Sequence, residues 1–199
     1  LIAIRREKLA RLRELGVDPF GGRFETDTTA FDLKEAFADD QDVRLAGRIL
    51  AIRDMGKSVF FVIGDVHGRI QGYLNKKGVS EKEWEVWQLL DRGDWIGIEG
   101  ITFTTGKGEP TVKVGSLQVL SKALRPMPDK WHGVADREIK YRKRHLDLMA
   151  NQGSADLFVL RSRMLAEIRN FFHEREFLEV ETPMLQDVAG GAAARPFET

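Results

Sequence analysis

The hydrophobic positions of the chain change their spacing twice, from a helical period to strand alternation and back. Near the N-terminus, Leu9, Leu12 and Leu15 recur at every third position, which predicts a short amphipathic helix over residues 4–15. Gly16 and Pro19 follow it and are typical stop signals. The chain therefore opens with one helix before the pattern changes.

Five short runs with strand-like composition follow between residues 43 and 120. The predicted strands are 43–52, 59–63, 69–74, 95–104 and 111–120. Turn residues occupy 65–68 and 105–110, and Ser80 with Glu83 forms a capping box that opens a helix to Leu90. Three strands, a helix and two strands is the order of an OB-fold barrel, although other small barrels share most of it.

A helical period returns after residue 150. Leu157, Leu160, Met164 and Ile168 recur three and four positions apart, which predicts a helix from about 156 to 174 with an apolar stripe typical of a core. Residues 177–181 alternate like a strand, which Pro183 ends or interrupts. The predicted fold class is α+β: a five-stranded OB-fold barrel, an N-terminal helix and a C-terminal helix and strand.

Composition limits the classes of partner. Lys+Arg and Asp+Glu both count 31, giving a net charge of +0, so any nucleic-acid site must be a local patch. The count of Cys is 0, which excludes disulfides and thiolate metal sites, and no apolar run approaches the ~20 residues of a membrane span. We expect a cytoplasmic protein. The first residues lack both a signal peptide and an initiator Met, so we also expect a trimmed or unseen start.

Two segments carry a local excess of positive charge. The first helix has five basic and two acidic side chains on its polar face, which leaves +3. Residues 122–144 have eight basic and three acidic side chains, which leaves +5 without His. Either segment could be a solvated face. Beside an OB barrel, the second is also suited to follow a phosphate backbone.

OB-folds bind bases by stacking them on aromatic rings and by hydrogen-bonding to their edges. Phe60 and Phe61 are neighbours on the second strand, so their rings point to opposite faces. We predict that Phe61 fills the core and Phe60 forms the stacking platform; the alternative is that both rings are buried. Asp65 and His67 are too few to hold a metal, and we expect no metal site.

Four polar residues are candidates for base or phosphate contacts. Gln71 offers the donor and acceptor that a uracil edge requires. Glu109, in the loop before the fifth strand, could accept from a base imino group, and Arg48 and Arg53 could meet phosphate or base. Each alone is a common surface residue. Their places on neighbouring strands favour a joint site.

Three runs of residues resemble one family. Met55-Gly56-Lys57, Phe60 and Gly68-Arg69-Ile70-Gln71 are similar to the barrel of the class II lysyl-tRNA synthetases. Residues 124–148 resemble their hinge segment almost word for word, and the loop 190–197 (GGAAARPF) resembles the end of their first signature motif. The resemblance implies four segments: an N-terminal helical segment (1–42), an OB-fold anticodon-binding domain (43–121), a hinge (122–150) and the start of a class II catalytic domain (151–199).

By this resemblance, the complete enzyme uses ATP, with Mg²⁺, to attach lysine to tRNA-Lys, and it is a homodimer. Phe60, Gln71, Glu109, Arg48 and Arg53 would bind the U-rich anticodon. Pro183 would lie at the dimer interface and the backbone of Gly190 and Gly191 near the lysine pocket. The ATP-binding motifs of the family would follow residue 199, so we expect no catalytic residue, no bound cofactor and no aminoacylation activity in this piece alone.

The chain departs from the family pattern at three positions. Gly64 stands where the family usually has Gln, Gly72 where it has Leu, and His145 where it commonly has Tyr. The two glycines should loosen the second and third strands or mark bulges. Two other functions stay open: an OB module that binds single strands nonspecifically, and a non-catalytic synthetase paralogue.

Overall fold

The fold was analysed in a computed structural model, which describes residues 1–128 and 133–183. The chain divides into two compact units, Leu1–Lys130 and Trp131–Thr199. Each unit has its own secondary structure.

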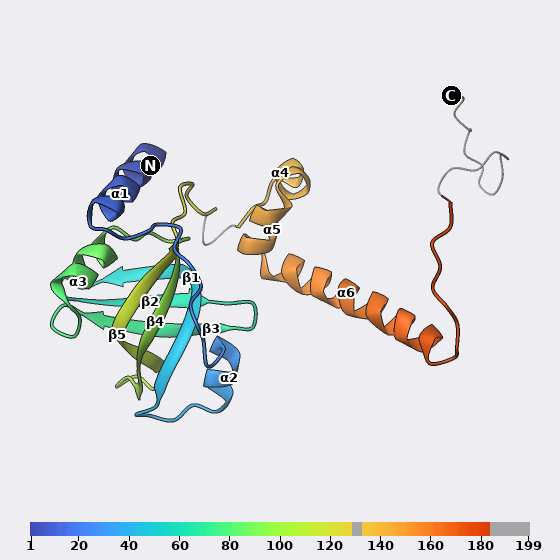
Figure 1. The fold of residues 1–199 in the computed structure, drawn as a ribbon, viewed down its shortest axis with the longest axis horizontal. Coiled ribbons are helices and arrows are strands. Elements are labelled where there is room, and N and C mark those ends of the chain that lie inside the picture. The colour runs from blue at the N-terminus through green and yellow to red at the C-terminus, as the bar shows by residue number, and fades with distance from the viewer. Residues whose placement is uncertain (129–132, 184–199) are drawn as a thin grey trace. The chain divides into compact units, whose positions relative to one another are not determined.

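The first unit is built on a closed five-stranded barrel (Figure 1). Around the barrel the strands follow the order β1-β2-β3-β5-β4, with β3 and β5 parallel and every other pair antiparallel. The bounds are Asp42–Asp54 (β1), Ser58–Gly64 (β2), Arg69–Asn75 (β3), Trp95–Thr104 (β4) and Pro110–Ser121 (β5). The predicted five strands and the OB-fold order are therefore confirmed.

Alternation along the strands explains the core of the barrel, because every second side chain points inward. Leu45, Ile63, Leu74 and Ile98 are each at most 1% exposed. Phe61 is 2% exposed and packs its ring against Trp87 of α3 (Glu81–Gln88), with 4.6 Å between centroids. The prediction that Phe61 belongs to the core is confirmed, and α3 closes the core with its own aromatic ring.

Three helices accompany the barrel. In α1 (Ile2–Glu14), Leu12 is fully buried, as the helical period predicts. The predicted capping box of α3 is present, since Ser80 Oγ accepts from Glu83 N and the Glu83 carboxylate accepts from Ser80 N. The helix α2 (Ala30–Glu35) is too short to show a hydrophobic period in the sequence. Its N-cap Thr29 is the local feature that indicates a helix start.

Gly72 does not mark a bulge in its strand, contrary to one expectation from the sequence. The β2–β3 register runs without a shift from Ser58 to Gly64. A Cβ at Gly72 would lie 2.3 Å from the Phe61 ring, so the missing side chain gives the space that this ring occupies. The large Phe61 side chain on β2 fills the space beside Gly72 on β3, which keeps the core densely packed.

The second unit contains the short helices α4 (Arg137–Arg142) and α5 (Arg144–Ala150) and the long helix α6 (Gln152–His173). Asp147 joins α5 to α6. It is fully buried and accepts from Asn151 Nδ2 at 2.7 Å, from Ser154 Oγ at 3.0 Å and from Arg144 Nη1 at 2.6 Å. These contacts, that of Asn151 first, lower the pKa of the Asp147 carboxyl.

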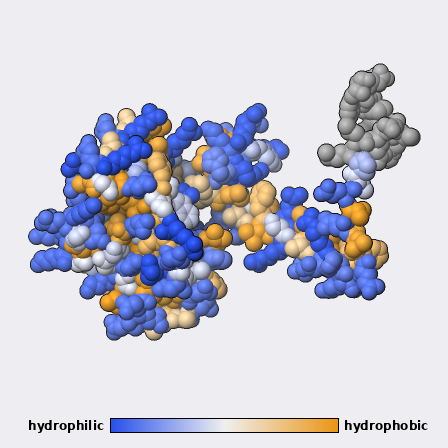
Figure 2. Space-filling view, viewed as in Figure 1, coloured by the Kyte–Doolittle hydropathy of each residue, from blue (hydrophilic) through white to orange (hydrophobic). Residues whose placement is uncertain are grey.

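The predicted strand at 177–181 is wrong, because these residues have no regular secondary structure. A strand needs a neighbouring backbone to pair with, and the described part of this unit offers none. The apolar stripe of α6 is present but is not a core in this chain: Leu157, Leu160 and Met164 are 53% to 64% exposed. Figure 2 shows hydrophobic residues among hydrophilic ones on the surface of this helix.

Pro183 is exposed in the irregular segment after α6. Gly190 and Gly191 lie outside the described residues. Over 1–128 and 133–183, the chain has no helix that combines the length and the apolar character needed to cross a membrane.

Candidate nucleic-acid interface

The outer face of β2 and β3 presents an aromatic ring that is not part of the core. Phe60 is half-buried, with its ring 4.9 Å from the Tyr73 ring and tilted by 44°. It points away from Phe61, as neighbouring positions of a strand must. The sequence alternative in which both rings are buried is therefore wrong.

Gln71 lies two residues before Tyr73 and therefore on the same face of β3. It lines a hollow of about 330 Å³ together with Phe60 and Arg53. Gln71 Nε2 donates to Thr111 Oγ1 at 2.9 Å, and Thr111 Oγ1 donates to the Glu109 carbonyl at 3.0 Å. The parallel β3–β5 register, with Gln71 opposite Thr111, creates this link. It holds the Gln71 side chain in place and connects it to the backbone of Glu109.

Of the two charged candidates Arg53 and Glu109, only Arg53 lines this hollow. Arg53 is exposed and stands directly opposite Phe60 in the β1–β2 register. The Glu109 side chain is exposed at the start of β5, and its backbone N–H donates to Thr105 Oγ1 at 3.0 Å. Both side chains are thus accessible to a ligand, and that of Arg53 lies beside Phe60.

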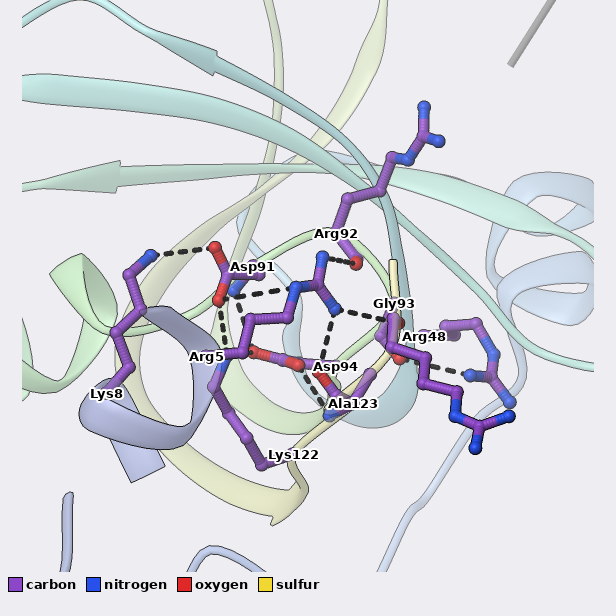
Figure 3. Close-up of polar contacts among 10 residues, drawn as sticks. Arg5, Lys8, Arg48, Asp91, Arg92, Gly93, Asp94, Lys122 and Ala123 are labelled. Carbon is purple, nitrogen blue, oxygen red and sulfur yellow. Dashed lines mark hydrogen bonds and ion pairs between the residues drawn. The ribbon is translucent and has the colours of Figure 1, made fainter. Parts of the chain in front are cut away.

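Arg48 lies elsewhere. It is paired with Gly64 in the register, about 13 Å along β2 from Phe60 at ~3.3 Å per residue. Its Nη1 donates to the Gly93 carbonyl at 3.0 Å (Figure 3). Its guanidinium also lies 5.1 Å from the centre of the Trp95 ring. Burial lowers the pKa of Arg48, and the charge of Asp94 only partly offsets this. The structure therefore brings Phe60, Gln71 and Arg53 together in one hollow and links Gln71 through Thr111 to the backbone of Glu109, but it does not place Arg48 there.

Several cations of the two basic segments are engaged inside the first unit. Lys122 is 2% exposed, and its Nζ contacts Asp91 at 2.6 Å and Asp94 at 2.8 Å. Lys8 pairs with Asp91 at 2.7 Å, and Arg5 of α1 donates to the carbonyls of Arg92, Ala123 and Arg125 (Figure 3). We call Arg5, Lys8, Asp91, Asp94 and Lys122 the α1 clasp.

The clasp corrects the charge count from the sequence. Its cations hold α1 and the residues after β5 to the barrel, so Arg5 and Lys122 are buried and the partly exposed Lys8 is paired with Asp91. Burial alone would raise the pKa of Asp91, but hydrogen bonds from Lys122 and Lys8 together outweigh it and lower the pKa. Charge counting missed the clasp because Asp91 and Asp94 come from a distant turn.

Sequence reasoning also passed over two residues on the same outer face. Phe103 on β4 has its ring 6.0 Å from that of Tyr73, and Lys113 on β5 is exposed opposite Tyr73 in the register. Strand alternation alone would have placed both on the outside. The closed order of the strands, with β5 beside β3, is what brings them next to Phe60.

Comparison with known proteins gives matches to two domain families and many relatives that align with nearly all of this chain. Residues 43–120 match the OB-fold nucleic acid binding domain, and residues 136–199 match the class II tRNA synthetases (D, K and N). The lysine–tRNA ligase of Staphylococcus epidermidis is 45% identical over 98% of this chain and 42% of its own length. That of Carboxydothermus hydrogenoformans is 46% identical over 100% of this chain and 41% of its own length.

The chain thus spans about two fifths of the length of the curated relatives it matches. Its barrel coincides with the OB-fold match, and α4 to α6 lie within the synthetase match. The chain is therefore a homologue of the class II lysine–tRNA ligases over nearly its whole length.

Proposed function

We propose that the barrel of this chain binds the anticodon of tRNA-Lys and that the protein to which it belongs is a lysine–tRNA ligase. The observation that carries the proposal is the half-buried Phe60 ring above a hollow lined by Gln71 and Arg53. An aromatic platform with one amide and one cation is what a single-stranded base requires. The OB-fold match and the lysine–tRNA ligase relatives support the same reading.

The amide of Gln71 suits uracil. One N–H of Nε2 is used by Thr111. That leaves Oε1 and the second N–H with no protein partner in the described part of the chain. Uracil offers the matching pair, an N3–H donor beside a carbonyl acceptor. A uridine stacked on Phe60 would therefore satisfy the remaining groups of Gln71.

The charged neighbours take different roles in the proposal. Arg53 contacts a phosphate or a base edge beside Phe60, and the Glu109 carboxylate accepts from the imino group of a neighbouring base. Arg48 acts only indirectly, by fixing β1 against the turn before β4 through the Gly93 carbonyl. Pro183 at a dimer interface and Gly190 and Gly191 at the lysine pocket stay part of the proposal for the whole enzyme.

The whole enzyme would use ATP and Mg²⁺ to activate lysine and would charge tRNA-Lys as a homodimer in the cytoplasm, where translation takes place. In residues 1–128 and 133–183, no three His, Asp or Glu side chains gather in a group that could hold a metal ion. We assign no step of catalysis to the described residues. Their proposed role is recognition.

The test measures binding of a fluorescently labelled tRNA-Lys anticodon stem-loop to the 199-residue protein by fluorescence anisotropy. Phe60→Ala should weaken binding by about 1–3 kcal/mol, the value of one base on an aromatic ring. Gln71→Ala should reduce the preference for uridine. Lys82→Ala, which removes an exposed lysine of α3 outside the Gln71 hollow, is the control. Equal binding of an unrelated stem-loop would instead favour a nonspecific single-strand-binding module.

A further inference from the structure

The residues that follow β5 form no helix or strand, yet the first unit holds them along their length. We call residues 122–128, which lead away from β5, the exit segment. Lys122 N donates to the Pro19 carbonyl at 2.8 Å, and Ala123 N donates to Asp94 Oδ1 at 2.8 Å. These two bonds fix the beginning of the exit segment. Four of its carbonyl groups are bound by arginine side chains.

Arg5 of α1 makes the first of these contacts. Its side chain is buried, and Nη1 donates to the carbonyls of Ala123 at 2.7 Å and of Arg125 at 3.1 Å. Its Nη2 donates to the Arg92 carbonyl at 3.0 Å (Figure 3). A planar guanidinium can reach carbonyls on two segments at once, which the single ammonium group of a lysine cannot do in the same way. One side chain therefore joins α1 to the exit segment and to the turn before β4.

Arg92, in the turn before β4, makes the second contact. Its Nη2 donates to the carbonyls of Pro128 at 2.7 Å and of Met127 at 3.4 Å. Met127 also packs on this turn, because a Cβ at Gly93 would lie 3.0 Å from Met127 Cγ. The turn is bound to β1 in its turn, since Gly93 N donates to the Ile49 carbonyl at 2.8 Å. The far part of the exit segment is thus held by the barrel and not by α1.

The two contacts differ in the stability of the elements that provide them. The turn with Arg92 belongs to the closed barrel, whose strands share one buried core. Helix α1 buries only Arg5 and Leu12. An element with few buried contacts opens locally at a lower free energy than the core of its domain. The Arg5 contact can therefore be lost while the barrel stays folded.

We propose that α1 is a latch on the exit segment. While α1 is docked, Arg5 positions the backbone of Leu124 and Arg125. When α1 opens, these two residues become mobile, whereas Ala123 stays bound to Asp94 and Met127 stays bound to Arg92. The docking of α1 thereby sets how firmly the chain is held where it leaves the barrel. All the contacts of this latch lie within the first unit, so it does not depend on RNA binding.

The experiment measures backbone order parameters by ¹⁵N relaxation of the 199-residue protein. In the parent protein, the N–H groups of Ala123, Leu124, Arg125 and Met127 should have values of about 0.85, typical of a rigid backbone. Arg5→Lys keeps the positive charge near Asp91 but loses the fork of donors. It should lower the values of Leu124 and Arg125 to about 0.6 or below and leave those of Ala123 and Met127 near about 0.85.

Arg92→Ala tests the second contact separately, because it should lower the order parameter of Met127 and leave Leu124 and Arg125 rigid. The control is Arg13→Ala, which removes an exposed arginine of the same helix and should change none of these values. The latch is overturned if Leu124 and Arg125 are already mobile in the parent protein, or if they stay rigid in Arg5→Lys. It is also overturned if Arg5→Lys loosens or unfolds the barrel strands, since Arg5 would then support the core and not the exit segment.

Discussion

The barrel and helix α6 have equally clear hydrophobic patterns, but only the barrel buries its apolar residues. In the barrel, the alternating residues of each strand are covered by the other strands and by α3, and Leu74 and Ile98 are fully buried. In α6, the apolar stripe stays open, and Leu160 is 64% exposed. Periodicity thus predicts that a face is apolar. Whether the same chain covers that face depends on the elements around it.

The two regions also differ in how they use charge. The barrel encloses ionic groups, since the Lys122 and Asp94 side chains are both 0% exposed. In the second unit, the Arg142–Glu138 pair is at least 75% exposed on both sides. Buried pairs are costly to break, because one charge is left without a partner, whereas exposed pairs contribute little. An ion pair therefore contributes differently to stability in the two units.

The largest effect should come from breaking the α1 clasp. Lys122→Ala leaves Asp94 buried without its cation and should lower the free energy of unfolding by about 3–5 kcal/mol. Arg142→Ala, in the exposed pair, should change it by no more than about 0.5 kcal/mol. Urea unfolding followed by circular dichroism and by Trp fluorescence measures both. A loss below 1 kcal/mol for Lys122→Ala would show that the clasp is not a tight contact in solution.

Deletion of matched leucines compares the two apolar faces directly. Leu74→Ala should cost about 2–5 kcal/mol, since it opens a cavity in the closed core. Leu160→Ala, on the open face of α6, should stay within about 0.5 kcal/mol when measured with this chain alone. Both values come from urea midpoints and slopes. A cost for Leu160→Ala that matches Leu74→Ala would mean that α6 is covered in solution.

Gly72 should resist enlargement although it lies in a strand. Gly72→Ala places a Cβ against the Phe61 ring, which Trp87 confines, and should destabilise the barrel by about 1–3 kcal/mol. Gly115→Ala on β5, where a Cβ meets only the Glu99 carbonyl oxygen at 3.9 Å, should instead stabilise by up to about 1 kcal/mol. Thermal unfolding of the two variants gives the sign. A stabilising Gly72→Ala would contradict the packing described here.

The smallest effect is the acid sensitivity of the barrel. The pKa of Asp91 is lowered from its ordinary value of 3.8 by Lys122 and Lys8. Its contribution to stability is therefore complete above pH 3.8 and is lost as the pH falls through the lower pKa of the folded state. Asp91→Asn should be less stable than the parent protein at pH 6, with a smaller difference at pH 3. Urea midpoints at the two pH values test this, and an unchanged difference would contradict it.

Much of the barrel could be predicted because its signals are local. Alternation, the turns at 65–68 and 105–110 and the capping box at Ser80 each act within a few residues. Asp65 illustrates this, since its Oδ1 accepts from the N–H groups of His67 and Gly68 within the turn. The inward Phe61 and outward Phe60 follow from the same local rule.

The remainder depends on contacts between distant residues. Nothing near Lys122 indicates that it pairs with Asp91 and Asp94 in an earlier turn, and nothing near Gly72 indicates the ring of Phe61 above it. Arg48 illustrates the same limit, because its pattern fits a surface cation and only the folded chain shows its bond to Gly93. The predicted strand at 177–181 failed for this reason as well, since alternation cannot supply a pairing partner.

The central claim is that the outer face around Phe60 and Gln71 recognises a uridine of the tRNA-Lys anticodon. The most direct measurement is the Kd of two stem-loops that differ only in their anticodon bases, uridines in one and cytidines in the other, for the parent protein and Gln71→Ala. We predict a preference of about ten-fold or more for the uridine stem-loop, largely lost in Gln71→Ala. Equal Kd values for the two stem-loops with the parent protein would contradict the account.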